Sequence, residues 1–145
     1  MKLKLILAAA LLAIGASVSA QTVIKFSHVV AVDTPKGKAA VFFAQKAAEL
    51  TKGKVKVEVY ANSALYKDKE EMEALQIGSV HMLAPSLAKF GPLGVKEFEA
   101  FDLPFIFDDT ADLHKVTQGP VGASLMAKLE PRGINLDSSV TQQRR

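Results

Sequence analysis

The chain has 145 residues, of which 49% are hydrophobic and 23% are charged, a composition typical of one globular domain. The formal net charge of +3 is too small to indicate a nucleic-acid partner. The sequence contains no cysteine, which excludes disulfides, thiolate metal ligands, a cysteine nucleophile and a lipid-modified cysteine.

The first 20 residues have the layout of a secretory signal peptide. Lys2 and Lys4 precede an apolar run over residues 5–16, and small residues then lead to Ala20. The run is shorter than a membrane-spanning helix, which needs about 20 residues. We therefore expect cleavage after Ala20 and a periplasmic product that is not embedded in the membrane. The loss of Lys2 and Lys4 reduces the 18 basic residues to 16, against 15 acidic ones.

Three segments of the remaining chain are predicted to be strands. Residues 23–29 are β-branched and aromatic, residues 55–59 alternate valine with charged residues, and residues 80–84 are apolar and precede a proline. Helical patterns separate the three segments, which gives a βαβαβ order. This order is typical of a right-handed unit with a parallel sheet, so the predicted fold class is α/β.

The two helices between these strands have recognisable ends. Thr34 should cap the first helix, with Pro35 at its first position and Gly53 just beyond its end. Asp68 should cap the second helix, with Glu71 completing a capping box. The spacing of apolar residues predicts that the buried face of the first helix contains Ala40, Phe43, Ala47 and Leu50.

The second half of the chain is less regular. Residues 98–107 hold four of the eight phenylalanines, and we interpret them as a core segment beneath a loop rather than as substrate contacts. Asp108 or Asp109 should cap a following helix. Gly119 and Pro120 interrupt that helix, and another is predicted to follow.

Ligands of parallel sheets bind beyond the carboxyl ends of the strands. This geometry places residues 28–30, 60–63 and 85–89 on one rim. His28 ends the first strand there, and the sequence leaves open whether it touches a ligand or is satisfied by a neighbouring residue.

Four other residues complete the candidate binding set. Lys36 lies in the first turn of a helix, where the helix dipole disfavours a cation, so it is either aimed at an anionic solute or simply solvated. Ser86 and Lys89 follow the third strand, and a hydroxyl with an ammonium group suits an oxygen-rich anion. Asp68 is also a candidate, although helix capping explains it equally well.

Catalytic motifs are missing from the sequence. It has no glycine-rich phosphate loop, no G-x-S-x-G motif and no H-E-x-x-H motif, and the spacing of its three histidines is not that of a metal site. We therefore expect a protein that is not an enzyme and holds neither metal nor cofactor. The alternative is an exported α/β enzyme of hydrolase type, for which Ser86 with His28 is the candidate pair. A short module that docks onto a membrane permease is a third hypothesis.

Seven blocks of the sequence resemble the DctP-type solute-binding proteins of tripartite ATP-independent periplasmic (TRAP) transporters. They follow the order and spacing of that family between residue 23 and about residue 133. The blocks are residues 24–29, 33–37, 53–60, 65–68, 74–80, 84–86 and 101–107.

The resemblance implies a periplasmic-binding-protein fold with two lobes that close on a small organic acid, such as a C4-dicarboxylate. It also implies delivery of the acid to TRAP permease subunits in the membrane, with uptake driven by an ion gradient. In this family the first lobe supplies strand-end residues to the cleft. The main partner of the carboxylate is an arginine of the second lobe, because a guanidinium binds a carboxylate through two hydrogen bonds.

The resemblance also predicts a truncated chain. Residues 1–20 would be the signal peptide, residues 21–134 part of the first lobe, and residues 135–145 a polar tail that departs from the family pattern, as after a frameshift or an early stop. Family members are expected to be roughly twice this length, so the second lobe and its arginine would be missing. Arg132, Arg144 and Arg145 are not expected to replace that arginine. A single lobe cannot close, so we expect impaired binding and marginal folding.

Overall fold

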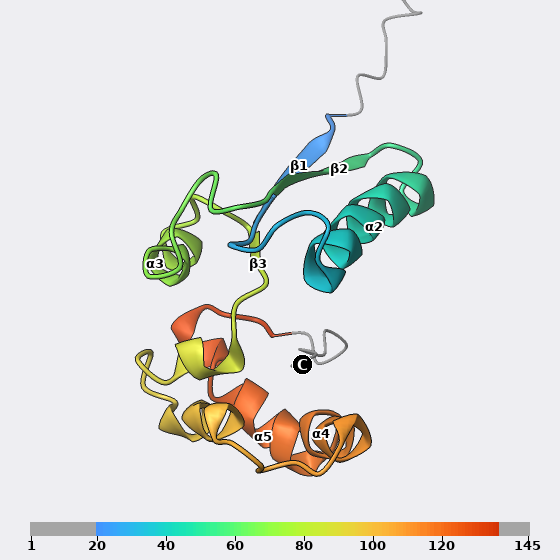
Figure 1. Ribbon diagram of the computed structural model, residues 1–145. Helices are drawn as coiled ribbons and strands as arrows, with labels where there is room; N and C mark the ends of the chain where they lie inside the picture. The colour runs from blue at the N-terminus through green and yellow to red at the C-terminus, as the bar shows by residue number, and fades with distance from the viewer. Residues whose placement is uncertain (1–19, 137–145) are drawn as a thin grey trace, which may run out of the picture.

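A computed structural model describes residues 20–136, which form an α/β unit and a helical unit. The α/β unit contains the strands with helices α2 and α3, and the helical unit contains α4 and α5 (Figure 1). The segment that follows β3 leads from the first unit into the second. The predicted signal peptide, apart from Ala20, and the predicted polar tail from residue 137 onward lie outside the described residues.

The sheet confirms the predicted α/β fold class and the βαβαβ order. Strand β1 (Thr22–Ser27) lies between β2 (Val55–Tyr60) and β3 (Met82–Leu83), and it is parallel to both. The pairing with β2 runs over the full length of both strands, whereas β3 pairs through two residues only. The carboxyl ends of all three strands therefore lie at one edge of the sheet.

Strand β3 is shorter than the predicted 80–84 because its first residues make other hydrogen bonds. The backbone N–H of Val80 donates to the carbonyl oxygen of Ala74 in α3, at 3.3 Å. His81 bonds to Lys25 partly through its side chain, since Nδ1 accepts from the Lys25 N–H at 3.0 Å. Pro85 has no N–H to continue the ladder.

Helix α2 (Pro35–Leu50) begins as predicted. The hydroxyl of Thr34 accepts a hydrogen bond from the Gly37 N–H at 3.1 Å and donates to the Ala31 carbonyl at 2.6 Å. Beyond the other end, the N–H of Gly53 donates to the Ala48 carbonyl at 2.8 Å while its φ is +78°, a conformation that favours glycine.

The buried face of α2 is only partly as predicted. Ala40, Ala44 and Ala47 pack on the sheet, but Phe43 is exposed except for an edge contact with Phe26, and Leu50 is 78% exposed. Sixteen helical residues span about 24 Å, whereas six strand residues span about 20 Å. The last turn of α2 therefore extends past the sheet, which leaves Leu50 without a surface to cover.

Helix α3 (Glu71–Gln76) begins two residues later than the capping box predicted, with Glu70 rather than Asp68 at the N-cap position. Asp68 does not cap it and instead forms an ion pair with Lys89. A turn precedes the helix, in which the N–H groups of Glu70 and Glu71 both donate to the carbonyl of Lys67. The turn keeps Asp68 away from the first helical N–H groups, so the predicted capping role of Asp68 and Glu71 is wrong.

The helical unit is built from short elements. Helix α4 (Thr110–Gln118) is capped by Asp109, which confirms one of the two predicted caps, and α5 (Pro120–Ala127) begins at the predicted proline. Three 3-10 helices accompany them: η1 (Leu87–Phe90), η2 (Lys96–Asp102) and η3 (Glu130–Arg132).

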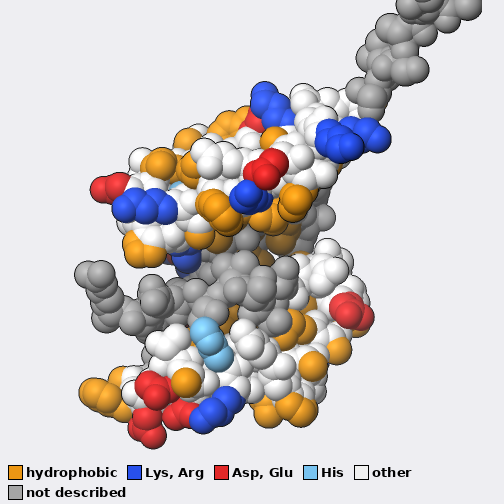
Figure 2. Space-filling model, turned by 90° about the vertical axis from the view of Figure 1, so that its right-hand side faces the viewer, with side chains coloured by type: hydrophobic (Ala, Val, Ile, Leu, Met, Phe, Trp, Pro, Cys, Tyr) orange, Lys and Arg blue, Asp and Glu red, His pale blue; other side chains and the backbone are white. Residues whose placement is uncertain are grey.

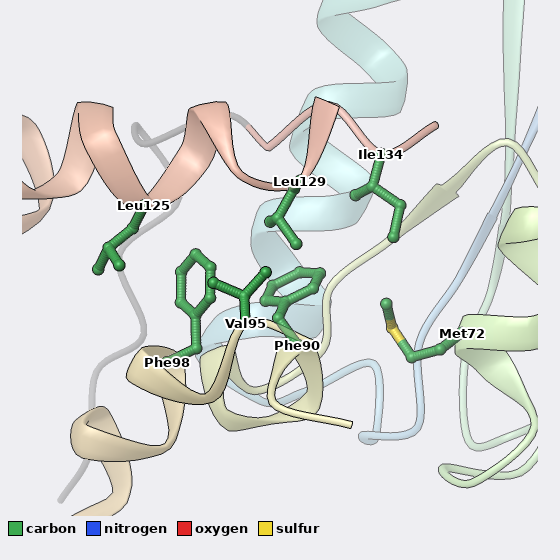
Figure 3. Close-up of a cluster of buried hydrophobic side chains, with 7 residues drawn as sticks. All are labelled: Met72, Phe90, Val95, Phe98, Leu125, Leu129 and Ile134. Atoms are coloured by element: carbon green, nitrogen blue, oxygen red, sulfur yellow. The ribbon is translucent and has the colours of Figure 1, made fainter. Parts of the chain in front are cut away.

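A second hydrophobic core joins the two units. Figure 3 shows Leu129 and Ile134 pointing toward Phe90 and Val95, with Met72 of α3 at the side of the cluster that lies toward the sheet. Because Met72 belongs to the α/β unit, the core couples the two units. Its buried members are Met72, Phe90, Val95, Phe98, Leu125, Leu129 and Ile134.

The aromatic segment contacts the core at its two ends but not in its middle, since Phe107 also packs against Phe101. Phe98 is buried and Phe101 packs against it, but Leu103 and Ile106 are exposed and Phe105 is 99% exposed. At Phe105 the backbone enters the left-handed region, with φ of 59°, so the side chain turns out of the core. The core interpretation is therefore wrong for residues 103–106.

These exposed residues border a hollow of about 320 Å³ whose wall also contains Asp108 and Asp109. On the face shown in Figure 2, acidic and hydrophobic side chains gather at one edge of the helical unit. Within residues 20–136, no helix is both long enough and apolar enough to span a membrane.

Substitution of Leu129 tests the second core. Leu129 is completely buried, and we expect Leu129→Ala to lower the free energy of unfolding by about 2–5 kcal/mol, because it removes buried contacts and leaves a cavity. Val121→Ala, at a position that is 57% exposed, is the control and should change it by less than about 1 kcal/mol. Urea unfolding followed by circular dichroism measures both, and equal effects would contradict this description of the core.

Candidate functional site

The carboxyl ends of β1 and β2 continue into loops that stay together. The N–H of His28 donates to the Tyr60 carbonyl at 3.0 Å, and the N–H of Asn62 donates to the Val30 carbonyl at 3.0 Å. The N–H of Ser63 donates back to the His28 carbonyl at 3.3 Å. The predicted neighbourhood of residues 28–30 and 60–63 is therefore confirmed.

The start of α2 reaches the third part of this rim. Lys36 Nζ donates to the carbonyl oxygen of Ala84, just after β3, at 2.9 Å. Gly37 allows this approach, because a Cβ atom there would collide with the Ala31 carbonyl oxygen. The loop from β1 thus packs closely on the first turn of α2 and directs Lys36 toward the strand ends.

Ion pairs and hydrogen bonds close the far side of the rim. Lys89 in η1 pairs with Asp68, which precedes α3, and both side chains are partly exposed. The Ser86 hydroxyl lies 3.4 Å from Asp102 Oδ1, to which it donates a long hydrogen bond. The ion pair joins the segment before α3 to η1, and the hydrogen bond joins two segments that both follow β3.

A buried carboxylate lies behind the rim. Glu71 at the start of α3 is 1% exposed, and its Oε1 accepts a hydrogen bond from the fully buried hydroxyl of Ser27 at 3.0 Å. Burial raises the pKa of Glu71, and the negative charge of Asp68 adds to that effect. The Ser27 hydrogen bond and the charges of Lys36 and Lys89 oppose it.

His28 is also fully buried. Its ring packs edge-on against Phe26, and neither ring nitrogen has a hydrogen-bond partner within the described part of the chain. Burial lowers the pKa of His28 and the charge of Lys36 lowers it further, while the backbone of Val30 acts in the opposite direction. Burial and the positive charge of Lys36 therefore both favour the neutral imidazole of His28.

Lys36 is the rim cation whose charge is least compensated. Burial lowers its pKa, and the distant charges of Glu71 and Asp68 raise it. Among residues 20–136, no carboxylate lies within the 4.0 Å of an ion pair with Lys36. Its ammonium group is therefore suited to attract an anion.

The structure brings all five predicted site residues to the strand-end side of the sheet: His28, Lys36, Asp68, Ser86 and Lys89. It does not join Ser86 and His28 as a nucleophile and base, because the Ser86 hydroxyl points to Asp102 and the His28 nitrogens are unbonded in the described chain. In that same part of the chain, no group of three or more histidine, aspartate or glutamate side chains has the arrangement of a metal site.

Sequence reasoning missed the Ser27 and Glu71 pair. Side chains alternate along a strand, so Phe26 faces the core under α2 while Ser27 faces the other side, toward α3. One signal was available in the sequence: Glu71 and Leu75 are four residues apart and share a helical face. A carboxylate on the apolar side of a helix indicates a buried polar contact.

Residues 26–138 match the sequence profile of bacterial extracellular solute-binding protein, family 7, also called DctP. The chain belongs to this family. The match confirms the resemblance found in the sequence, and family 7 is a family of solute-binding proteins rather than of enzymes.

Individual relatives agree with the family 7 assignment. The C4-dicarboxylate-binding periplasmic protein DctP of Rhodobacter capsulatus is 69% identical over 112 residues, which are 77% of this chain. A TRAP periplasmic solute-binding protein of Sulfurospirillum deleyianum with bound succinate is 52% identical, with a TM-score of 0.74 over 79% of this chain. One from Pseudomonas aeruginosa with bound L-malate is 49% identical, with a TM-score of 0.72 over 77% of this chain.

The chain spans about a third of the length of these family 7 proteins. The aligned part is 34% of the Rhodobacter protein, 36% of the Sulfurospirillum chain and 39% of the Pseudomonas chain. These shares agree with the expectation that family members are roughly twice as long as this chain.

Replacement of Glu71 by glutamine tests the buried carboxylate through the pH dependence of stability. The pKa of Glu71 in the folded chain is raised above its unfolded value of about 4.3. Ionisation of Glu71 therefore destabilises the fold as pH rises from the unfolded pKa to the folded pKa. The free energy of unfolding of Glu71→Gln, relative to the unsubstituted chain, should thus increase from about pH 4.3 upward and then level off. Urea unfolding at several pH values measures this difference. Glu73→Gln, exposed on the same helix, should show no such trend.

Proposed function

We propose that the chain is part of a periplasmic solute-binding component of a TRAP transporter, which binds a C4-dicarboxylate or a similar organic acid. The observation that carries this proposal is the strand-end rim, where Lys36 and Lys89 approach one edge of a parallel sheet. Relatives of high identity support the solute class, because two of them hold succinate and malate.

In this proposal Lys36 is the first contact of a solute carboxylate. It already donates to a backbone carbonyl and has no carboxylate within ion-pair distance in the described residues, so an anion adds an interaction without breaking an ion pair. Burial strengthens such an interaction, because fewer waters screen it.

The other proposed contacts require rearrangement. Lys89 must exchange Asp68 for the solute, and Ser86 must turn its hydroxyl from Asp102. The cost of these exchanges is modest, because both contacts are at least partly exposed. His28 offers one N–H donor and one acceptor in its neutral form.

The complete binding site needs more than this rim. We propose that a second lobe contributes an arginine to the solute carboxylate, as the family resemblance implies, and that closure of two lobes excludes water from the cleft. Export through a cleaved signal peptide and delivery to TRAP permease subunits belong to the same proposal. No contact in the described residues favours the alternative of a hydrolase.

Succinate titration of the chain tests the proposal. We expect chemical shift changes in backbone amide resonances of residues 28–36 and 84–89, with a dissociation constant well above 1 μM because one lobe binds without closure. Lys36→Gln should weaken binding at least about tenfold, the loss of one charge-assisted contact. Lys38→Gln, exposed on the same helix, should leave the affinity unchanged.

Two results would contradict the proposed site. Equal weakening by Lys36→Gln and Lys38→Gln would show that only the overall charge matters. Submicromolar binding by the chain alone would show that no second-lobe arginine is required.

A further inference from the structure

Glu71 combines deep burial with the lack of an ion pair. Its side chain is 1% exposed, and within the described residues its carboxylate accepts one hydrogen bond, from the neutral hydroxyl of Ser27. No lysine, arginine or histidine nitrogen of that part of the chain lies within 4.0 Å of it. An ionised carboxylate in such a place is costly, because one neutral donor does not replace its hydration.

The charges around Glu71 come from every element near the rim. Lys36 of α2 and Lys89 of η1 attract its negative charge from a distance, and Asp68 before α3 repels it. His28 at the end of β1 is buried and favoured in its neutral form. Glu70 and Glu73 of the same helical region are exposed to solvent.

We propose, on the basis of the proposed function, that Glu71 is a specificity-determining residue of the rim. Its carboxylate takes up a proton from solvent when a dicarboxylate binds at Lys36. An arriving solute carboxylate engages the same ammonium group that attracts Glu71. It also adds negative charge near this buried acid, because Lys36 bonds to Ala84, one residue beyond Leu83, and Leu83 pairs with Ser27, the hydrogen-bond partner of Glu71. Both changes disfavour the ionised form of Glu71, as for two carboxylates that share one site.

The coupling between Glu71 protonation and solute binding determines whether the rim binds a solute with one or two negative charges. With Glu71 ionised, the rim repels a second negative group, whereas the protonated carboxyl group is neutral and gains an O–H donor. Binding of a dianion should therefore weaken as pH rises through the titration of Glu71. A monocarboxylate brings less charge and should depend less on pH.

The test follows the Glu71 carboxyl carbon by NMR in the full chain labelled with ¹³C-glutamate. Glu71→Gln assigns the signal by its disappearance. We expect the titration midpoint of Glu71 to move to higher pH by at least about 0.5 units with saturating succinate, a change of about threefold in proton affinity. Sodium chloride of equal ionic strength should not move it.

Affinity measurements provide the second readout. The ratio of the succinate dissociation constant of the unsubstituted chain to that of Glu71→Gln should rise with pH, because deprotonation of succinate itself changes both constants equally and cancels in the ratio. The same ratio taken with Glu73→Gln in place of the unsubstituted chain should rise as much, since Glu73 is exposed.

The outcomes separate this inference from the proposed function. If succinate shifts the rim resonances while the Glu71 midpoint stays in place, the coupling is refuted and the binding function stands. If succinate changes no rim resonance at saturating concentration, both fail. If Glu71→Gln does not fold, Glu71→Asp assigns the signal by its disappearance from the glutamate-labelled chain, and the response of the midpoint in the unsubstituted chain then decides the inference.

Discussion

Strand β1 is paired on both sides, and the candidate site depends on this arrangement. Parallel hydrogen bonding to β2 and β3 fixes where each strand ends, so loops that are distant in sequence meet at one edge of the sheet. The bonds between His28 and Tyr60, and between Lys36 and the carbonyl after β3, continue this order beyond the strands. Without β1 between β2 and β3, Lys36 of α2 and Lys89 of η1 would not approach the same edge of the sheet.

The electrostatic properties of the rim follow from the burial of its ionisable groups. Helices on either side of a short sheet exclude water from its end, which makes three ionisable groups unusually responsive to their neighbours: His28, Lys36 and Glu71. Burial disfavours the charged form of each, so a new charge at the rim changes their protonation more than it would at an exposed surface. A solute-binding protein can use this property to distinguish anions that differ in charge.

The elements and their order could be predicted from local sequence. Thr34 and Pro35 define the start of α2, and the valines of β2 alternate as in any strand with one buried face. These signals depend on residues that are close in sequence. The family resemblance is of the same kind, because it rests on short blocks in a fixed order, and the family 7 match confirms it.

Predictions failed where the contacts of a residue depend on segments that are distant in the sequence. Asp68 has the sequence position of a helix cap, but the chain turns before α3 and Asp68 pairs with Lys89, 21 residues away. Leu50 has the spacing of a buried residue, yet the sheet beneath α2 ends before it.

The sequence by itself thus determined the α/β order, the start of α2 and the family, because capping, alternation and short blocks of family-like sequence are local properties. Only the tertiary structure decided that Ser27 and Glu71 meet in a buried hydrogen bond and that Phe105 faces solvent. Burial and long-range pairing depend on how the elements pack, and a side chain acquires its pKa from neighbours that packing brings together.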